Sequence, residues 1–315
     1  MWRAVSLIVL VVLLAMLAGC PAGDEPVREV RLQSGPVTAV AEPPPDDTPV
    51  RFVLTSVLSP DRSTLPYARF AAHLTARLGR RVVIVRRRTY RELNDLLRNG
   101  HADAGIICAG AYAVGREEFG LRMLTVPLMG GAATYRAYVI ARRDSNKARL
   151  ADLAGSVFAF SDPMSNTGYR HVAAVLHARG TTPSGFFSRT FFTYSHDNTI
   201  EAVRDGIADA GVVDSLVWDH LVREDPRLEE QVQIIERSGD FPNSPVVVSP
   251  HATSELVTRL RVVLLEMPAD LAGAEILQDL GISGFVSVPD RDFDPIAASW
   301  RDLGVVTTAP REGGR

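Results

Sequence analysis

A polar segment in the middle of the sequence carries the side chains best suited to bind an anion. Ser165, Asn166 and Thr167 follow an apolar run at 157–160 and precede a helical pattern over 169–179. Backbone N–H groups at the start of a helix are free to donate, and the helix dipole favours negative charge there. Two hydroxyls and an amide add donors that suit a tetrahedral oxyanion. The plainer interpretation is that Ser165 or Thr167 only caps the helix.

A second junction between a strand and a helix places a histidine in a similar position. His196 follows Ser195 and an apolar run at 191–194, and a helical pattern comes after it. It could donate to an anion as imidazole or imidazolium, or it could make only a local loop contact. Ser165 and His196 could also form a nucleophile and its base, but no oriented third group, Gly-x-Ser-x-Gly motif or P-loop accompanies them. We therefore predict a binding protein without catalytic residues rather than a hydrolase.

The elements that hold these segments alternate between strand and helix, which is typical of a parallel, doubly wound sheet. The sequence also repeats itself, because Gly-x-Ala-Asp-Ala-Gly occurs at 100–105 and again at 206–211, an offset of 106 positions. Convergent turn chemistry is the alternative, since glycine is common where helices end. A single repeat predicts two similar α/β lobes with a ligand crevice beyond the carboxyl ends of their strands. The expected strands are 51–55, 81–85, 104–107, 157–160 and 191–194, and the expected helices are 65–78, 90–97, 169–179 and 198–204.

The composition excludes several classes of protein. The chain has 315 residues, of which 46% are hydrophobic and 23% charged, so it is not a disordered chain. A formal net charge of -3 gives no basis for a nucleic-acid partner. Two cysteines exclude a disulfide scaffold. His171 and His177 are six positions apart and do not share a helix face, so we expect no metal site and no cofactor.

The N-terminus resembles a signal for export and lipid attachment. Arg3 precedes an apolar run at 7–18, which is too short to span a bilayer comfortably. The run ends in Leu-Ala-Gly-Cys, which resembles the bacterial lipobox. We predict a signal peptide over 1–19 and a lipid on Cys20, with an ordinary cleaved signal as the alternative. Such a lipid would anchor the mature chain to a membrane outside the cytoplasm.

The residues after Cys20 are predicted to form a tether. Seven prolines and no apolar periodicity over 21–49 favour an extended, polyproline-like segment, so we assign the anchor and tether to 20–49. Cys108 then has no disulfide partner, and we expect it to be a small buried apolar residue. The arginines between Arg80 and Arg91 form a basic cluster that is either a solvated edge or a contact for anionic lipid or a partner.

Taken in order, these motifs resemble the phosphate/phosphite/phosphonate-binding proteins of ABC transporters. The resemblance runs from about Arg51 to about Val305. It is carried by Asp-Pro-x-Ser-x-Thr-Gly-Tyr at 162–169, Phe-Phe at 186–187, Ser-His-Asp at 195–197, the second copy of the repeat, and Phe-Pro-x-x-Pro at 241–245.

The resemblance implies an α/β fold, that of a two-lobed type II periplasmic binding protein. Each lobe would be a doubly wound, mostly parallel sheet, and two crossover strands would form the hinge. It implies a first lobe of 50–141 plus 246–305, a second lobe of 142–245 and a tail of 306–315. It also implies that these six residues bind the ligand: Tyr90, Tyr135, Ser165, Asn166, Thr167 and His196.

Three positions depart from patterns within this family. Asn166 stands where Thr or Ser is frequent, which changes the geometry of the hydrogen bonds to the ligand. Leu216 and Ser244 stand where binders of aminoalkylphosphonates place acidic residues, which disfavours a ligand with an amine. Tyr90 and Tyr135 could alternatively be half-buried packing residues.

The resemblance implies a function without chemistry. A monomer would capture a small phosphorus oxyanion (phosphite, a phosphonate or phosphate) and deliver it to an ABC permease. The same fold could instead sense a ligand for a membrane signalling partner, and the sequence does not separate the two.

Overall fold

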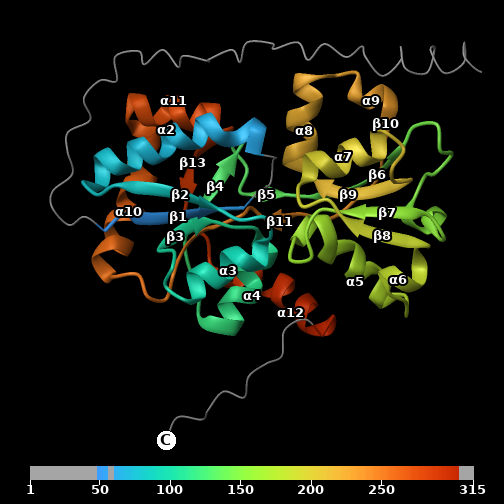
Figure 1. Cartoon of the computed structure of the whole chain (residues 1–315), viewed down its shortest axis with the longest axis horizontal. Helices are drawn as coiled ribbons and strands as arrows, with labels where there is room; N and C mark the ends of the chain where they lie inside the picture. The colour runs from blue at the N-terminus through green and yellow to red at the C-terminus, as the bar shows by residue number, and fades with distance from the viewer. Residues whose placement is uncertain (1–47, 56–59, 305–315) are drawn as a thin grey trace, which may run out of the picture. The chain divides into compact units, whose positions relative to one another are not determined.

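The computed structural model of the protein describes residues 48–55 and 60–304. The predicted signal peptide (1–19), Cys20, most of the tether (20–49) and the tail (306–315) lie outside these residues. In the described part, strands and helices alternate around two separate sheets (Figure 1). None of the described helices combines the length and the apolar character needed to cross a membrane.

The first sheet has six strands and carries the part of the protein that we call lobe 1. Three neighbouring strands are parallel, and the other three add to them in antiparallel fashion. In spatial order the strands are β13 (Ile282–Val286), β4 (Arg122–Met129), β12 (Val246–Val248), β3 (Ala104–Ile106), β1 (Val50–Leu54) and β2 (Val82–Arg86).

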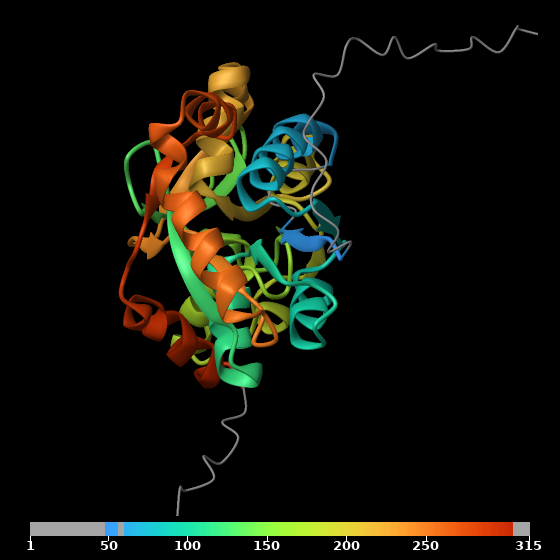
Figure 2. The same ribbon diagram turned by 90° about the vertical axis from the view of Figure 1, so that its left-hand side faces the viewer.

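Helices cover both faces of this sheet. Figures 1 and 2 show α2 and α3 on opposite sides of β1. One face is covered by α2 (Pro60–Leu78), α10 (Ser254–Glu266) and α11 (Leu271–Asp279), and the other by α3 (Tyr90–Arg98), α4 (Ala109–Phe119) and α12 (Asp294–Asp302). Two short helical turns, η3 (Met267–Ala269) and η4 (Asp290–Phe293), complete the lobe.

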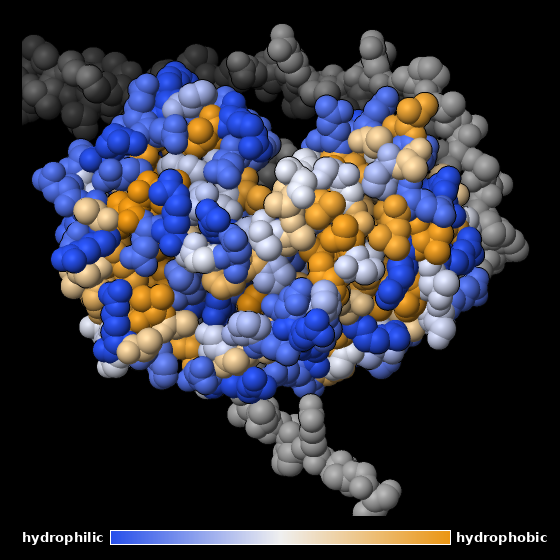
Figure 3. Space-filling model, turned by 180° about the vertical axis from the view of Figure 1, so that it is seen from behind, coloured by the Kyte–Doolittle hydropathy of each residue, from blue (hydrophilic) through white to orange (hydrophobic). Residues whose placement is uncertain are grey.

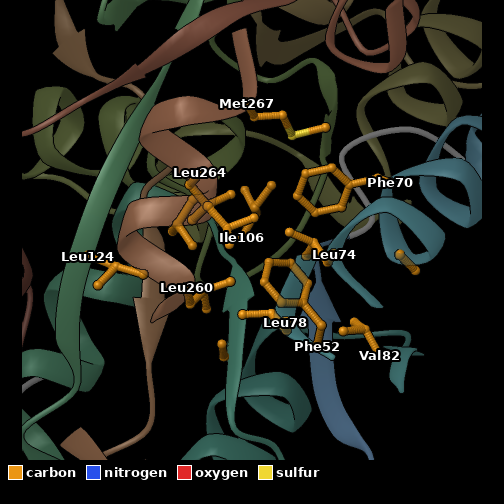
Figure 4. Packing of buried hydrophobic residues seen from close by; sticks show 14 of the residues in the cluster. Phe52, Phe70, Leu74, Leu78, Val82, Ile106, Leu124, Leu260, Leu264 and Met267 are labelled. Atoms are coloured by element: carbon orange, nitrogen blue, oxygen red, sulfur yellow. The ribbon is translucent and has the colours of Figure 1, made fainter. Parts of the chain in front are cut away.

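Apolar side chains from sheet and helices interlock between these layers. In Figure 4, Phe52 of β1 and Phe70 of α2 meet edge to face, with ring centroids 5.7 Å apart. Leu260 and Leu264 approach from α10, and Met267 closes the cluster. Burying aromatic and aliphatic side chains of this size is the main source of stability for such a layer.

The second sheet has five strands and carries lobe 2. In spatial order they are β10 (Val232–Arg237), β6 (Ala137–Arg142), β9 (Ala210–Asp214), β7 (Val157–Phe160) and β8 (Arg189–Phe192). One face packs against η1 (Leu150–Leu153), α5 (His171–Ala178) and α6 (Pro183–Phe186), and the other against α7 (His196–Arg204), α8 (Ser215–Glu224) and α9 (Leu228–Gln231).

Two short strands connect the sheets. The chain passes from β4 to β6 through β5 (Thr134–Tyr135) and returns to β12 through β11 (Phe241–Pro242). β5 and β11 pair with each other in antiparallel fashion between the two sheets (Figure 1). These are the crossover strands, and they lie a few residues before the lobe boundaries that the sequence suggested. As a result, β6 pairs within the second sheet along its whole length.

The sheets are less uniformly parallel than the sequence predicted. The parallel core of each is only three strands wide, β2-β1-β3 in lobe 1 and β8-β7-β9 in lobe 2. The strand beside each core, β12 in lobe 1 and β6 in lobe 2, is antiparallel to it and follows directly after a crossover between the lobes. The prediction of a doubly wound α/β arrangement is otherwise confirmed, and the expected strands appear within a few residues of their predicted bounds.

The internal repeat forms the same structure twice. Asp103 accepts a 2.7 Å hydrogen bond from the backbone N–H of Arg51, at the start of β1. Asp209, 106 positions later, accepts one of the same length from Val157, at the start of β7. The repeated aspartates thus connect the turn before one parallel strand to the beginning of its neighbour.

On the face shown in Figure 3, apolar residues form several separate patches among hydrophilic ones.

Candidate functional site

The six predicted ligand residues lie at the starts of helices in both lobes and on a strand that joins them. Tyr90 is the first residue of α3 and His196 the first of α7, and each follows a capping side chain, that of Thr89 or Ser195. Tyr135 lies on the crossover strand β5. Ser165, Asn166 and Thr167 follow β7, and all six side chains are at most 3% exposed.

The loop after β7 folds back on itself and enters an unusual helical turn. The backbone N–H of Ser161 donates to the carbonyl of Gly168 (3.1 Å), which closes the loop. The Ser165 hydroxyl accepts from the N–H of Gly168 (2.9 Å), so Ser165 does cap the turn that follows. That turn is a π-helix, η2 (Asn166–Arg170), and α5 continues from it. Single π-turns inside helices are frequent at functional sites.

The imidazole of His196 is held in one tautomer. Its Nδ1 lies 3.1 Å from the backbone N–H of Asp214 and must accept that hydrogen bond. The remaining proton therefore resides on Nε2, which is a donor. Burial lowers the pKa of His196 to about 4, so the ring is neutral at neutral pH. Gly168 lets the loop lie against the ring, because a Cβ on that residue would lie 2.9 Å from Cε1 of His196.

Direct hydrogen bonds join the two lobes across the site. The backbone N–H of Tyr90 donates to the Asp162 carboxylate (3.1 Å). The Asn166 side chain donates to the Tyr135 hydroxyl (3.2 Å), and its backbone N–H donates to Sγ of Cys108 (3.4 Å). The lobes are therefore closed on one another, with residues of both in contact.

Several buried polar atoms near these contacts between the lobes lack a protein partner. The hydroxyls of Tyr90, Ser161 and Thr167 are buried without any hydrogen bond. Leaving such a group unpaired costs about 1–3 kcal/mol. Buried hydroxyls left unpaired on both lobes, beside the hydrogen bonds that join those lobes, are expected of a site that takes up a polar ligand. Tyr90 and Thr167 were both among the predicted ligand residues.

Sequence reasoning missed three buried charged residues beside this cluster. Burial raises the pKa of Asp162 to about 6 and that of Asp214 to about 7. Arg170 ends the π-turn and donates through Nε to the Asn166 carboxamide oxygen (2.6 Å). The repeat offered a signal for one of them. Asp214 lies 106 positions after Cys108, so the two residues occupy equivalent places in the two copies. Cys108 itself is a free, buried thiol, as predicted, but it also accepts the N–H of Asn166.

Comparisons with known proteins agree with this architecture. The sequence profile of the family described as "ABC transporter, phosphonate, periplasmic substrate-binding protein" matches residues 52–293. The phosphate-import protein PhnD of Mycolicibacterium smegmatis is 23% identical over 248 residues, which cover 71% of this chain and 76% of that protein.

Two solved structures show the same fold. One is the binding-protein component of an ABC phosphonate transporter from Pseudomonas aeruginosa, with a TM-score of 0.75, 21% identity, and coverage of 85% of this chain and 91% of the other. The second is PhnD1 of Prochlorococcus marinus in complex with methylphosphonate, with a TM-score of 0.75, 15% identity, and coverage of 83% and 100%. The profile match spans well over half of the sequence. The chain therefore belongs to the family of phosphonate ABC transporter substrate-binding proteins, which have the type II periplasmic fold, act outside the cytoplasm and are not enzymes.

Proposed function

We propose that the closed crevice binds a small phosphorus oxyanion, which the protein delivers as a monomer to an ABC permease. The observation that carries the proposal is the pair of unpaired hydroxyls on Tyr90 and Thr167, one from each lobe. An oxyanion placed between them would accept both. The proposed ligand residues are Tyr90, Tyr135, Ser165, Asn166, Thr167 and His196.

The donors suit an anion better than a neutral ligand. The Nε2–H of His196 and the hydroxyls of Tyr90 and Thr167 supply hydrogen, and an anion accepts such bonds more strongly than a neutral group does. Burial raises the pKa of Tyr90 well above its ordinary value, which keeps its hydroxyl protonated and able to donate. The six residues are at most 3% exposed, and hydrogen bonds to an anion are stronger in such low-dielectric surroundings than in water.

Entry of the ligand requires the lobes to separate. Ser165, Asn166 and Thr167 are fully buried in the closed form. We expect the lobes to rotate about β5 and β11, the two segments that join them, and to close again over the ligand. The hydrogen bond between Tyr90 and Asp162 would then form only while the lobes are closed, with or without a ligand.

The test is calorimetric titration of the purified chain with phosphite, methylphosphonate, phosphate and sulfate. Tyr90→Phe and Thr167→Val each remove one unpaired hydroxyl and keep the shape of the side chain. Each should weaken binding of the preferred phosphorus oxyanion by about 10-fold or more. Tyr138→Phe and Thr190→Val, on β6 and β8, are matched controls and should bind as wild type does. Folded, ligand-free protein that binds none of these anions would refute the proposal.

We propose further that the ligand carries no amine. Leu216 packs against the cluster that contains Tyr90 and Tyr135, and it offers no charge to an ammonium group. Ser244, the other position of interest, offers only a hydroxyl. Methylphosphonate should therefore bind more tightly than 2-aminoethylphosphonate in the same titration, and the reverse order would contradict this part of the proposal.

We propose that the chain is anchored by a lipid on Cys20 after removal of residues 1–19. The support is the short apolar run that ends in Leu-Ala-Gly-Cys. Without the Cys20 thiol the protein cannot receive the lipid. Cys20→Ala should therefore leave the membrane fraction of the producing cell or retain its uncleaved signal peptide. Mass spectrometry of the N-terminal peptide gives the direct readout, and an unmodified Cys20 in the mature protein would refute the anchor.

A further inference from the structure

Arg170 is buried to an unusual degree for its type. Only 5% of it is exposed, and among the residues whose side chains the structure describes it is the one Arg or Lys that is buried. Its position results from the π-turn, in which its backbone N–H donates to the carbonyl of Ser165 (3.0 Å) rather than to the next carbonyl along the chain. Because of this wider turn, Arg170 lies over the loop that contains Asn166.

The guanidinium belongs to a chain of hydrogen bonds that leads into the crevice. Nε of Arg170 donates to Oδ1 of Asn166 (2.6 Å), and Nδ2 of Asn166 donates to the Tyr135 hydroxyl (3.2 Å). The guanidinium carbon also lies 5.1 Å from the ring centroid of Phe241, on the crossover strand β11. Arg170 therefore contacts Asn166 in lobe 2 and Phe241 on β11, and Asn166 in turn connects it to Tyr135 on β5.

No carboxylate of the described residues forms an ion pair with Arg170. The buried acids nearby already have other partners. Asp162 accepts from the backbone N–H groups of Tyr90 and Met164, at 3.1 and 2.7 Å. Asp214 accepts from the N–H of Leu216 at 2.8 Å. Burial lowers the pKa of Arg170 to about 10, which still leaves it charged at neutral pH.

A buried charge without a counter-charge is costly, and proteins tolerate it where a ligand or partner supplies the opposite charge. We propose that Arg170 is a specificity residue of the anion site, whose positive charge selects a dianionic phosphorus oxyanion over a monoanion of similar shape. This inference rests on the proposed function and names the charge state of its ligand.

Asn166 is the necessary neighbour of this arginine. Its carboxamide oxygen receives Arg170, and this fixes the NH2 group toward Tyr135. A threonine or serine at position 166 would offer one hydroxyl in place of this two-ended amide. The departure at Asn166 and the buried Arg170 therefore form one unit that carries charge and orientation together.

The test compares two tetrahedral anions at one mildly alkaline pH. Phosphite is then a dianion, whereas hypophosphite has a single ionisable oxygen and stays a monoanion. Arg170→Met keeps an unbranched apolar stem over Phe241 but removes the charge. It should weaken phosphite binding by about 10- to 100-fold, the range of a hydrogen bond to a charged group, and hypophosphite binding by clearly less.

Two variants serve as comparisons. Arg170→Lys keeps the charge and should retain part of the preference for phosphite. Arg189→Met is the matched control, because Arg189 is exposed and lies 5.9 Å from the ring centroid of Phe191, outside the crevice. This variant should bind both anions as wild type does.

Stability separates a role in binding from a structural one. Arg170→Met relieves the cost of a buried charge but leaves the Asn166 carboxamide oxygen without its donor, so the melting temperature of the ligand-free variant should change little. A lower melting temperature together with equal losses for both anions would make Arg170 a structural residue and overturn the inference. An unchanged preference for phosphite in Arg170→Met would overturn it as well. If wild-type protein binds neither anion, the proposed function fails first, and the result is recognisable as such.

Discussion

The two lobes begin their helices at equivalent positions but place different chemistry there. Tyr90 and His196 are 106 positions apart, and each is the first residue of the helix that follows the second parallel strand of its lobe. Cys108 and Asp214 have the same offset, and each is the N-cap of the next helix, α4 or α8. Lobe 1 thus contributes neutral side chains, whereas lobe 2 contributes an imidazole and a carboxyl group.

The comparison separates what the scaffold needs from what the site needs. The scaffold needs the capping hydroxyls of Thr89 and Ser195 and the aspartates of the repeat, which make the same bonds in both lobes. The residue that follows each cap contacts the crevice and is free to differ. At these positions the two copies share a capping side chain and differ in the residue that follows it.

The largest expected effect concerns Asp214, the ionisable counterpart of Cys108. Burial raises its pKa from an ordinary 3.8 to about 7, so its ionised form is disfavoured in the folded protein. Its stabilising contribution is complete below pH 4 or so and is lost as pH rises through about 7. Between about pH 5 and pH 8 this loss amounts to about 3 kcal/mol, at about 1.4 kcal/mol per pKa unit.

Urea unfolding of ligand-free wild type and variants at the two pH values measures this loss as a difference between proteins, because the lowered pKa of His196 changes stability in the opposite direction over the same range. Asp214→Asn keeps the cap on Leu216 but cannot ionise, so most of the loss should disappear in this variant. The exposed Asp209 is the control, and Asp209→Asn should leave the loss in place. Should Asp214→Asn show the same pH dependence as wild type, the difference in charge between the lobes would have no energetic meaning.

Much of the fold could be predicted from the sequence because its signals are local. The apolar runs, the glycines at helix ends and the repeat located both sheets, and all six proposed ligand residues are buried, with Asn166 bonded to Tyr135 across the lobes. The crossovers were placed a few residues late because Tyr135 continues smoothly into the apolar run of β6. The proportion of parallel strands was overestimated since strand direction depends on long-range connections that no local pattern encodes.

The charged neighbours of the site were missed for a different reason. The helical pattern over 169–179 assigns Arg170 to an ordinary α-helix, and the wider π-turn appears only once the loop is folded. Asp162 and Asp214 precede helical turns, where acidic residues are ordinary caps. Their burial is a tertiary event, and Asp162 in particular lies against Tyr90 of the opposite lobe. The sequence therefore showed the donors but not the charges that surround them.

A second prediction tests the comparison at Gly110, whose counterpart in lobe 2 is Leu216. A Cβ on Gly110 would lie 2.4 Å from the carbonyl oxygen of Met164, so lobe 2 can close on lobe 1 only because this residue is a glycine. Gly110→Leu gives lobe 1 the residue that lobe 2 has at the equivalent position. It should destabilise the closed state by about 2 kcal/mol, which corresponds to about 30-fold weaker binding of the preferred oxyanion.

Small-angle scattering checks the mechanism behind this loss. Gly110→Leu should remain in an expanded form when the ligand is added, while wild type becomes more compact. Gly185→Ala, in α6 of lobe 2, is the control, because its nearest neighbour would be a threonine hydroxyl of the same lobe at 3.2 Å. Tight binding and full compaction by Gly110→Leu would show that the close approach at Gly110 does not limit closure.

The third prediction concerns His196, the counterpart of Tyr90. His196→Phe removes the acceptor of the Asp214 N–H, which then stays buried without a partner. Stability of the ligand-free protein should fall by about 1–2 kcal/mol, and binding should weaken since the Nε2–H donor is also lost. His171→Phe is the control, because half-buried His171 only packs near Phe241, with ring centroids 6.0 Å apart. Equal losses in the two variants would remove the special role of the imidazole.

The smallest effect lies where equivalent residues of the two lobes touch each other. Arg88 and Tyr194 are 106 positions apart, and the guanidinium carbon of Arg88 lies 4.2 Å from the centroid of the Tyr194 ring. Tyr194 adopts a left-handed backbone conformation, with φ of 64°, as the chain turns from β8 toward His196.

An exposed cation–π contact is worth about 0.5–1 kcal/mol, so Arg88→Ala should weaken ligand binding by about 2- to 5-fold through a less stable closed state. Tyr194→Leu should have the same effect, Tyr194→Phe should have none, and the double variant Arg88→Ala/Tyr194→Leu should be no worse than either single one. Additive losses in the double variant would mean that the two residues act separately, and that the symmetry of the lobes does not extend to the contact between them.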